Sequence, residues 1–231
     1  MDSNGVDLRV VRKISRTSLR LRVYERLKAL IVTNRLSPGQ EMGIDLLAGQ
    51  LSVSQTPVRE ALAMLELEGL VVMGQHKTPR VTDVSTRDVH DVYEMRILLE
   101  GWAAEKSADL VADSDLDRAE EMLAEVEKEA HEDRLSSHLD ADIAVHQVII
   151  RPIRNELFQR LYGLVGDRSI RIRSLAEAHS AQQIVTITKE HREIVDALRS
   201  HRPTSARERV VHHLQRAMAR TLSALSEMKS G

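Results

Sequence analysis

Asp142, His146, His191 and His213 have the residue types and spacing to bind one metal ion. Asp142 and His146 are four positions apart, so on a helix their side chains project from the same face. A carboxylate oxygen and an imidazole nitrogen at that spacing can share one divalent cation. Taken alone, the pair favours an ordinary Asp–His contact on a helix surface over a metal site. His191 and His213 strengthen the metal interpretation, because side chains from separate helices can meet inside a bundle.

The chain contains ten histidines, and we expect most of them to be solvated. His138 precedes Asp142 by four positions and is a weaker alternative to His146. His212 would point about 100° away from His213 on a helix, so it is excluded from the ligand set. The remaining histidines show no pattern of partners; they are His76, His90, His131, His179 and His201.

A metal with Asp and His ligands and open positions suits more than one class of protein. It could catalyse hydrolysis or isomerisation of a small carboxylate, but an enzyme also needs a general base beside the metal, and the sequence nominates none. It could instead be purely structural in a DNA-binding protein, in which case metal loss would unfold the domain. We expect no enzymatic activity, and we keep a metal-dependent enzyme and a DNA-binding protein with a structural metal as the two alternatives.

The elements that must position these ligands are helices. Aromatic residues make up only 2% of the chain, which favours helix-on-helix packing over a β-sandwich. Ser85 and Asp88 resemble a capping box that opens the first helix of residues 85–231. Beyond it we expect an all-α bundle with helices at roughly 86–112, 114–131, 133–151, 154–179, 183–201 and 203–228.

Residues 19–84 read as a separate domain with a different pattern. Apolar residues recur at helical spacing from Leu19 to about Asn34, and shorter helices are expected at 44–51 and from Ser54 to about Glu68. Ser54 can cap the last of these, because its hydroxyl can accept from free backbone N–H groups. Short strands at 70–73 and 80–82 flank a polar turn. Three helices followed by a hairpin predict a winged helix-turn-helix, and residues 1–18 a flexible basic arm.

Charge is distributed unevenly between the two parts of the chain. The net charge is −2, yet residues 1–84 carry twelve Lys or Arg against nine Asp or Glu. A basic face of this kind suits contact with DNA phosphates. In a winged helix the helix opened by Ser54 enters the major groove, where an arginine can pair with guanine. The predicted DNA-binding residues are Ser54, Gln55, Thr56 and Arg59 on that helix and His76, Lys77 and Arg80 on the wing.

Residues 47–71, LAGQLSVSQTPVREALAMLELEGLV, resemble the DNA-binding signature of the GntR superfamily, and Leu-Ser-Pro-Gly at 36–39 fits it as well. The chain departs from the family at Gln55 and Ser52, where Arg and Gly are frequent. The base preference therefore stays open, and slight strain is expected at Ser52. The resemblance implies a homodimeric transcriptional regulator, in most cases a repressor, that binds double-stranded operator DNA.

The second part resembles the FCD effector domain of the FadR subfamily of GntR regulators. The matching segments are Asp142-Ile-Ala-Val-His146, His191-Arg-Glu-Ile-Val-Asp-Ala-Leu198, His213-Leu214, Asn155, and Glu94-Met-Arg96 with Glu100. This resemblance implies that Asp142, His146, His191 and His213 hold zinc, nickel or manganese, and that a small organic acid binds at the open positions.

Arginines near the expected metal site could bind such an acid. Arg96 could form a fork for the carboxylate, or else a surface salt bridge to Glu100 four positions on. Arg173 is a second predicted effector-binding residue, and Arg171 a weaker one. The chain has no cysteine, no apolar run of about 18 residues and no apolar segment typical of a secretory signal. We therefore expect a cytoplasmic protein without disulfides or a membrane span.

Overall fold

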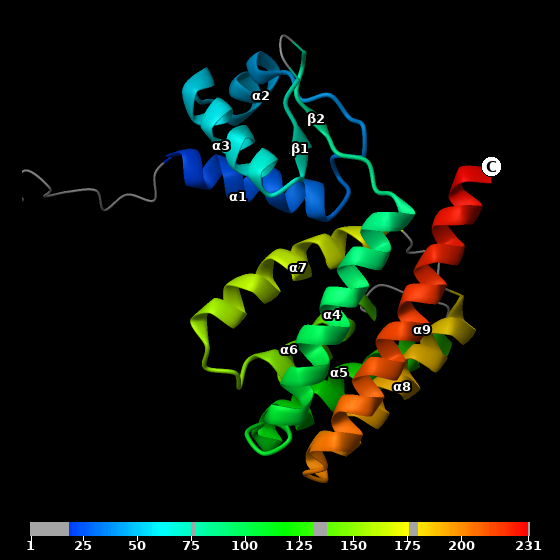
Figure 1. The fold of residues 1–231 in the computed structure, drawn as a ribbon. Helices are drawn as coiled ribbons and strands as arrows, with labels where there is room; N and C mark the ends of the chain where they lie inside the picture. Colours follow the sequence, from blue (N-terminus) through cyan, green and yellow to red (C-terminus); the bar gives the residue numbers. More distant parts are fainter. Residues whose placement is uncertain (1–18, 75–76, 132–137, 176–179, 231) are drawn as a thin grey trace, which may run out of the picture. The chain divides into compact units, whose positions relative to one another are not determined.

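The computed structural model describes residues 19–74, 77–131, 138–175 and 180–230 (Figure 1). The chain divides into two compact units, residues 1–83 and 84–231. The predicted arm, residues 1–18, lies outside the described residues. Among the described helices, none combines the length and apolar character that a bilayer crossing requires.

The first unit consists of α1 (Leu19–Val32), α2 (Ile44–Leu51), α3 (Gln55–Leu67), β1 (Val71–Val72) and β2 (Arg80–Val81). Helices α1 and α3 pack together, and the short strands form an antiparallel pair in which Val71 faces Val81. Glu41 adds a bridge to Arg80. The unit has its own core, to which each helix contributes; Leu27, Leu47 and Leu62 are among its buried residues. This arrangement confirms the winged helix-turn-helix.

The turn between α2 and α3 has two features of its own. Ser52 has a left-handed backbone with φ 54°, at the position where the related signature often has glycine. A residue with a Cβ pays about 1 kcal/mol there, which agrees with the slight strain expected. Ser54 occupies the cap position of α3 with an extended backbone, but its side chain makes no capping hydrogen bond. The expected capping role of its hydroxyl is therefore absent, and that hydroxyl is exposed.

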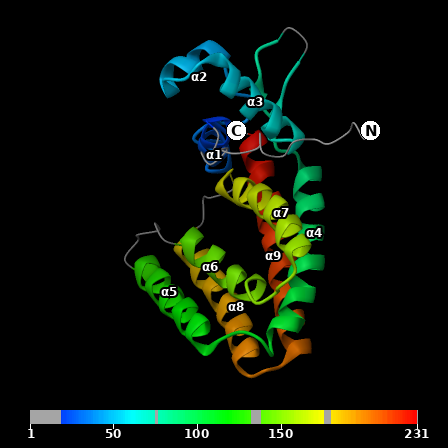
Figure 2. The ribbon, with the colours of Figure 1, turned by 90° about the vertical axis from the view of Figure 1, so that its left-hand side faces the viewer.

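The second unit is all helical, as predicted. It consists of α4 (Thr86–Ser107), α5 (Asp113–His131), α6 (His138–Ile150), α7 (Glu156–Leu175), α8 (Ala181–Arg199) and α9 (Pro203–Ser230). Helix α9 lies along α4, and α8 lies between α5 and α9 (Figure 2). Helix α6 contacts α4, α5 and α8. Three of these helices, α6, α8 and α9, carry the predicted metal ligands.

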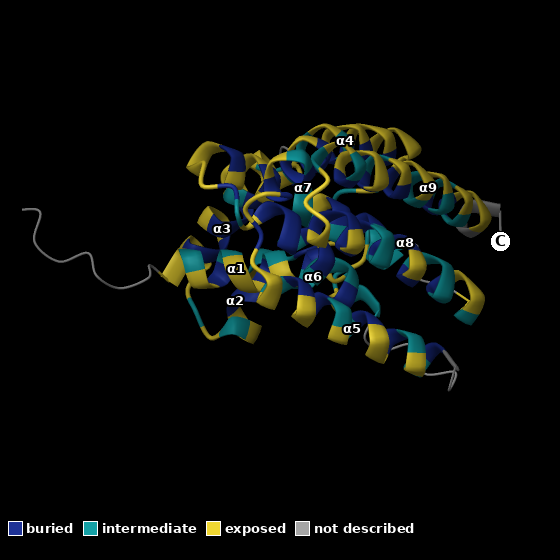
Figure 3. Cartoon of the chain, turned by 90° about the horizontal axis from the view of Figure 1, so that it is seen from below, coloured by how far each residue is buried: buried dark blue, intermediate teal, exposed yellow. Residues whose placement is uncertain are grey.

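Capping and packing explain where these helices begin and what they bury. Ser85 and Asp88 form the predicted capping box, and Ser180 with Gln183 forms a second one at the start of α8. Asn155 accepts a hydrogen bond from the backbone N–H of Phe158 at 3.1 Å, so α7 begins at Glu156 rather than at 154. Buried and exposed residues alternate along each helix (Figure 3). The buried faces carry mainly Val, Leu, Ile and Ala, in keeping with the scarcity of aromatic residues.

Candidate metal centre and DNA-binding face

The folded second unit brings together the four predicted metal ligands. Each of Asp142, His146, His191 and His213 offers one ligand atom, and these atoms all lie within 4.8 Å of one another. Asp142 and His146 come from α6, as their four-residue spacing predicts, while α8 and α9 supply one histidine each. Each histidine is only 2% exposed. The cluster therefore lies inside the bundle rather than on its surface.

The Nε2 atoms of the histidines face the interior of this cluster. Nε2 of His191 lies 3.3 Å from Nε2 of His213 and 3.5 Å from Oδ1 of Asp142. The same aspartate oxygen lies 3.9 Å from Nε2 of His146. Three nitrogens and one oxygen in this arrangement could each move by a fraction of an ångström toward a shared cation.

Two buried glutamates contact the opposite sides of two of these rings. Oε2 of Glu100 lies 2.5 Å from Nδ1 of His146, and Glu190 pairs with Nδ1 of His213 at 2.9 Å. A carboxylate favours a proton on the nitrogen beside it, which leaves a lone pair on Nε2. A carboxylate behind a ligating histidine is the usual outer shell of a metal site, because it fixes the tautomer and the ring orientation.

Burial keeps the histidines neutral, which is the form that binds metals. Desolvation lowers the pKa of His146, with Glu100 opposing the shift, and lowers the pKa of His191 further, because His213 and His146 repel an added charge. Desolvation also lowers the pKa of His213 to about 4, although its hydrogen bond to Glu190 opposes this. Near neutral pH each of these imidazoles is therefore neutral, with one N–H and one lone pair.

The glutamates stay ionised although they are buried. Burial would raise the pKa of Glu100, but the charge of Arg96 and the contact with His146 outweigh it and hold the pKa well below its ordinary value. For Glu190 the opposing groups are His213 and Arg220, which lower the pKa to about 2. The interior of the unit thus contains fixed negative charge directly behind two of the imidazoles.

The residues present fit a divalent metal. Nε2 of His146 is buried and makes no hydrogen bond, although a buried polar atom normally has a partner. A cation would satisfy it together with the Nε2 atoms of His191 and His213, which face each other at 3.3 Å. Nitrogen donors with one carboxylate oxygen suit zinc, nickel or manganese, as expected from the resemblance.

The predicted effector arginines occupy different environments. Arg96 forms the expected i,i+4 ion pair with Glu100 at 2.7 Å, but this pair is buried and not on the helix surface. Arg173 contacts the carboxylate of Asp142, next to the cluster. Arg171 is buried as well, yet it lines neither of the pockets that adjoin the cluster.

Among the described residues, two pockets adjoin the cluster, and Arg173 lines both of them. One is walled mainly by apolar residues of α5, α6 and α8, and reaches Asp142 and His191. The other, which we call the polar pocket, is lined by Arg96, His146, Gln147, Tyr162, Ser169 and Arg173, with Ile143, Gly166 and Ile170. His138 lines the apolar pocket and does not belong to the metal cluster, in agreement with its lower ranking.

The sequence analysis did not identify the residues that contact the candidate metal-ligating histidines. Glu190 directly precedes His191 but pairs with His213 of the next helix, a contact that no sequence spacing indicates. Arg216 and Arg220 hold the same carboxylate from α9. Burial and the nearby charge of Glu100 raise the pKa of Tyr162 of α7, a neighbour that was equally unforeseen. The segment Glu94-Met-Arg96 with Glu100 did point to the neighbourhood, although not to the contact between Glu100 and His146.

The predicted DNA-binding residues of α3 share one exposed face. Ser54, Gln55, Thr56 and Arg59 are all exposed at its N-terminal end. Arg59 donates to the Gln55 side chain at 3.2 Å, and Gln55 donates in turn to Asp45 of α2. These groups bond only to one another at the surface and could exchange those bonds for bonds to DNA.

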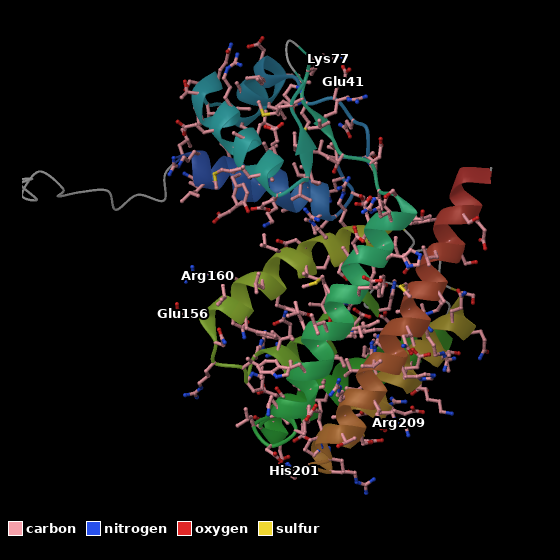
Figure 4. All side chains as sticks on the ribbon, viewed as in Figure 1. Glu41, Lys77, Glu156, Arg160, His201 and Arg209 are labelled. Atoms are coloured by element: carbon pink, nitrogen blue, oxygen red, sulfur yellow. The ribbon has the colours of Figure 1, made fainter. Side chains whose placement is uncertain are left out.

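The wing carries the remaining predicted contacts. Lys77 and Arg80 are exposed, and Lys77 lies near the tip of the hairpin (Figure 4). Arg80 sits in β2, opposite Val72. His76 lies outside the described residues. The exposed cations of the wing and of α3 all belong to the first unit. The core of that unit is apolar, so its charged side chains lie mainly at the surface.

Comparison with known proteins agrees with both halves of the structure. Residues 19–81 match the model of the bacterial regulatory proteins of the gntR family, and residues 91–216 match the FCD domain. The regulator YdhC of Bacillus subtilis is 28% identical over 90% of this chain and 93% of its own length. A probable D-xylose utilization operon transcriptional repressor of Paenarthrobacter nicotinovorans is 30% identical, with 88% of each chain covered.

A solved structure shows the same fold. The putative GntR regulator from Rhodococcus sp. RHA1 superposes with a TM-score of 0.75 at 22% identity, over 90% of this chain and 99% of that one. Together with the family matches over both units, this likeness leaves no other fold family in question. The chain belongs to the GntR family of transcriptional regulators and carries an FCD domain behind its winged helix-turn-helix.

Proposed function

We propose that this protein is a repressor of the FadR subfamily whose affinity for operator DNA is controlled by a small organic acid. The acid binds at a divalent metal held by Asp142, His146, His191 and His213. One observation carries the proposal: these four donor atoms lie within 4.8 Å of one another inside the bundle, with charged glutamates behind two of the rings. A cluster of neutral imidazoles has no evident role in packing alone.

The exposed end of α3 supports the DNA-binding half. Arg59 is placed to read a base edge in the major groove, while Ser54, Gln55 and Thr56 are short polar groups suited to phosphates or base edges. Lys77 and Arg80 extend the basic surface to the wing, with His76 beyond the described residues. A homodimer supplies two such heads for the half-sites of an inverted repeat.

The surroundings of the cluster support the acid-binding half. A metal with protein ligands on one side polarises and orients a carboxylate at its open positions. Arg173 lines both adjoining pockets and can pair with the carboxylate of an acid as it pairs with that of Asp142. Arg96 borders the polar pocket while Glu100 fixes its position. These arginines orient an acid and offset its charge.

Control of DNA binding requires that the acid prefer one arrangement of the protein over another. Helices α6, α8 and α9 each contribute a residue to the cluster. An acid that draws the metal-ligand atoms of the cluster closer together therefore shifts the packing of these helices. If the two DNA-binding heads differ in freedom between the arrangements, operator affinity changes by the same coupling free energy.

Three measurements test the proposal on the full-length protein. An operator is first selected from random duplexes, and its affinity is measured while a broad panel of small organic acids is added. We expect at least one acid to change the affinity, and chelation of the metal to abolish that change. Turnover of the acid would instead indicate an enzyme. A lower melting temperature on chelation, with no acid changing operator affinity, would indicate a purely structural metal.

A further inference from the structure

One hydroxyl in the polar pocket lacks the partner that its position on a helix would normally provide. Ser169 of α7 is 1% exposed, and its Oγ makes no hydrogen bond to the described residues. Leaving a buried hydroxyl unpaired is unfavourable compared with leaving it in water. Such a group needs an explanation, and a bound ligand is one.

Other helical hydroxyls of this chain show what Ser169 could have done. Ser174, on the same helix, donates to the carbonyl oxygen of Ile170 at 2.9 Å. Thr186 and Thr221 donate to the carbonyls four residues before them, also at 2.9 Å. This local bond is available to serine and threonine in any helix. Ser169 does not make it, and its side chain lines the polar pocket instead.

The pocket around Ser169 has both charge and space. Arg173 lies four residues further along α7, so the two side chains share one face of that helix, with Cβ atoms about 5–6 Å apart. Gly166 lies one turn earlier, and a Cβ added there would meet only Tyr162, at 4.0 Å. The absent side chain leaves room beside Ser169. His146, a candidate metal ligand, completes this wall.

We propose that Ser169 binds the effector directly and selects acids with an oxygen substituent close to the carboxylate. The effector class is then a 2-hydroxy or 2-oxo acid. Arg173 takes the carboxylate, and the Ser169 hydroxyl bonds to the second oxygen. The separation of these two side chains on α7 sets the distance between the two groups of the ligand. This inference rests on the proposed acid-sensing function and adds which acids the site prefers.

The test uses pairs of acids that differ in one polar substituent: propionate and lactate, butyrate and 2-hydroxybutyrate, succinate and malate. Binding to the full-length protein as purified is measured by calorimetric titration. We expect the hydroxylated member of at least one pair to bind about tenfold or more tightly, the effect of one hydrogen bond in a buried site. Ser169→Ala should reduce this preference to within about threefold, with the plain acid bound as before.

Ser174→Ala is the matched control, because its hydroxyl already has a partner in the helix. It should retain the full preference for the hydroxylated acid. If the wild-type protein binds both members of every pair equally, or if Ser169→Ala weakens both members alike, the selectivity role of Ser169 is wrong. If no acid of the broad panel changes operator affinity, the proposed acid-sensing function fails instead.

A second measurement needs no ligand. In the acid-free protein, Ser169→Ala removes an unpaired buried hydroxyl, so we expect an unchanged or higher melting temperature. Ser174→Ala removes a bonded hydroxyl and should lower the melting temperature slightly. A clear loss of thermal stability in acid-free Ser169→Ala, larger than in the control, would show that the hydroxyl has a structural partner and would overturn the assignment.

Discussion

The two units of this protein use charge in opposite ways. In the winged unit the predicted contact residues that the structure describes are exposed, and Arg59 bonds to another exposed side chain, Gln55. In the FCD unit the charges of Glu100, Arg96 and Glu190 are buried. Glu100 and Arg96 pair with each other, and Glu190 pairs with groups of α9. DNA is a long polyanion, and a solvated protein surface can exchange its own surface hydrogen bonds for bonds to the phosphates. A small metal ion instead needs donor atoms that are already held in position. The buried charges should therefore be far more sensitive to substitution.

The largest expected effect is on metal content. His191→Ala together with His213→Ala removes two of the four donor atoms, both from buried histidines, so stoichiometric metal retention should be abolished. Elemental analysis of the purified variant measures it. His212→Ala is the control, because that histidine is exposed on α9 and should leave the metal content unchanged. Full metal content in the double variant would show that the ligands were chosen wrongly.

Loss of one buried charge should have a large effect on stability. Glu100→Gln leaves Arg96 without its ion-pair partner in the interior, which costs about 3–5 kcal/mol of the free energy of unfolding. Urea denaturation measures this loss. Glu156→Gln removes a carboxylate from an exposed pair with Arg160 at the start of α7 (Figure 4) and should cost little or nothing. Equal losses in the two variants would contradict the contrast between buried and exposed charge.

The metal-free FCD unit should also lose stability in mild acid. The pKa of His213 is lowered from 6.5 to about 4 in the folded chain, so the unfolded chain binds more protons. The free energy of unfolding therefore falls as the pH drops below about 6.5, by roughly 3 kcal/mol from this group by about pH 4. Glu190 stays ionised over this range because its pKa lies at about 2.

Denaturation of chelator-treated protein between pH 7 and pH 4 measures this dependence. His213→Asn removes the titrating imidazole and should flatten part of the curve. His212→Asn, which changes an exposed neighbour, should leave the curve as in the wild type. A metal-free protein whose stability is constant across this range would contradict the assignment of buried, neutral imidazoles.

A smaller effect is expected on the exposed side. Arg59→Ala should weaken operator binding by about 1–3 kcal/mol, the discrimination that one arginine–guanine contact provides, while stability stays unchanged because the side chain is exposed. Fluorescence anisotropy with the selected operator measures it. Arg160→Ala, an exposed arginine of the FCD unit, serves as the charge-matched control. Undiminished operator binding by Arg59→Ala would remove α3 as the recognition helix.

The helices and the Asp142–His146 pair could be predicted because they depend on local spacing, whereas the resemblance to the FCD domain was needed to add His191 and His213. Asp142 and His146 share a face by helical geometry alone, and the capping box at Ser85 depends on one neighbour three positions away. Helix ends were less predictable: α4 ends at Ser107, before the expected 112. Its last turn depends on packing that the pattern of apolar residues does not encode.

The partners of the ligands could not be predicted, because they depend on how helices pack and rotate against one another. Glu190 reaches His213 only because α8 and α9 lie side by side. A salt bridge from Arg96 to Glu100 on the helix surface was one of the two alternatives for Arg96; burial of the pair follows from the packing of α4 against α6, α7 and α9. The missing hydrogen bond of Ser169 could not be predicted either, because the sequence around Ser169 resembles the sequence around Ser174, whose hydroxyl is hydrogen bonded.

The most direct test of the metal centre is anomalous diffraction from crystals of the full-length protein, recorded at the zinc, nickel and manganese edges. The account predicts one peak per chain, at about 2.0–2.2 Å from Nε2 of the three histidines and from an oxygen of Asp142. Stoichiometric metal at any other place in the chain, with none among these four side chains, would contradict it.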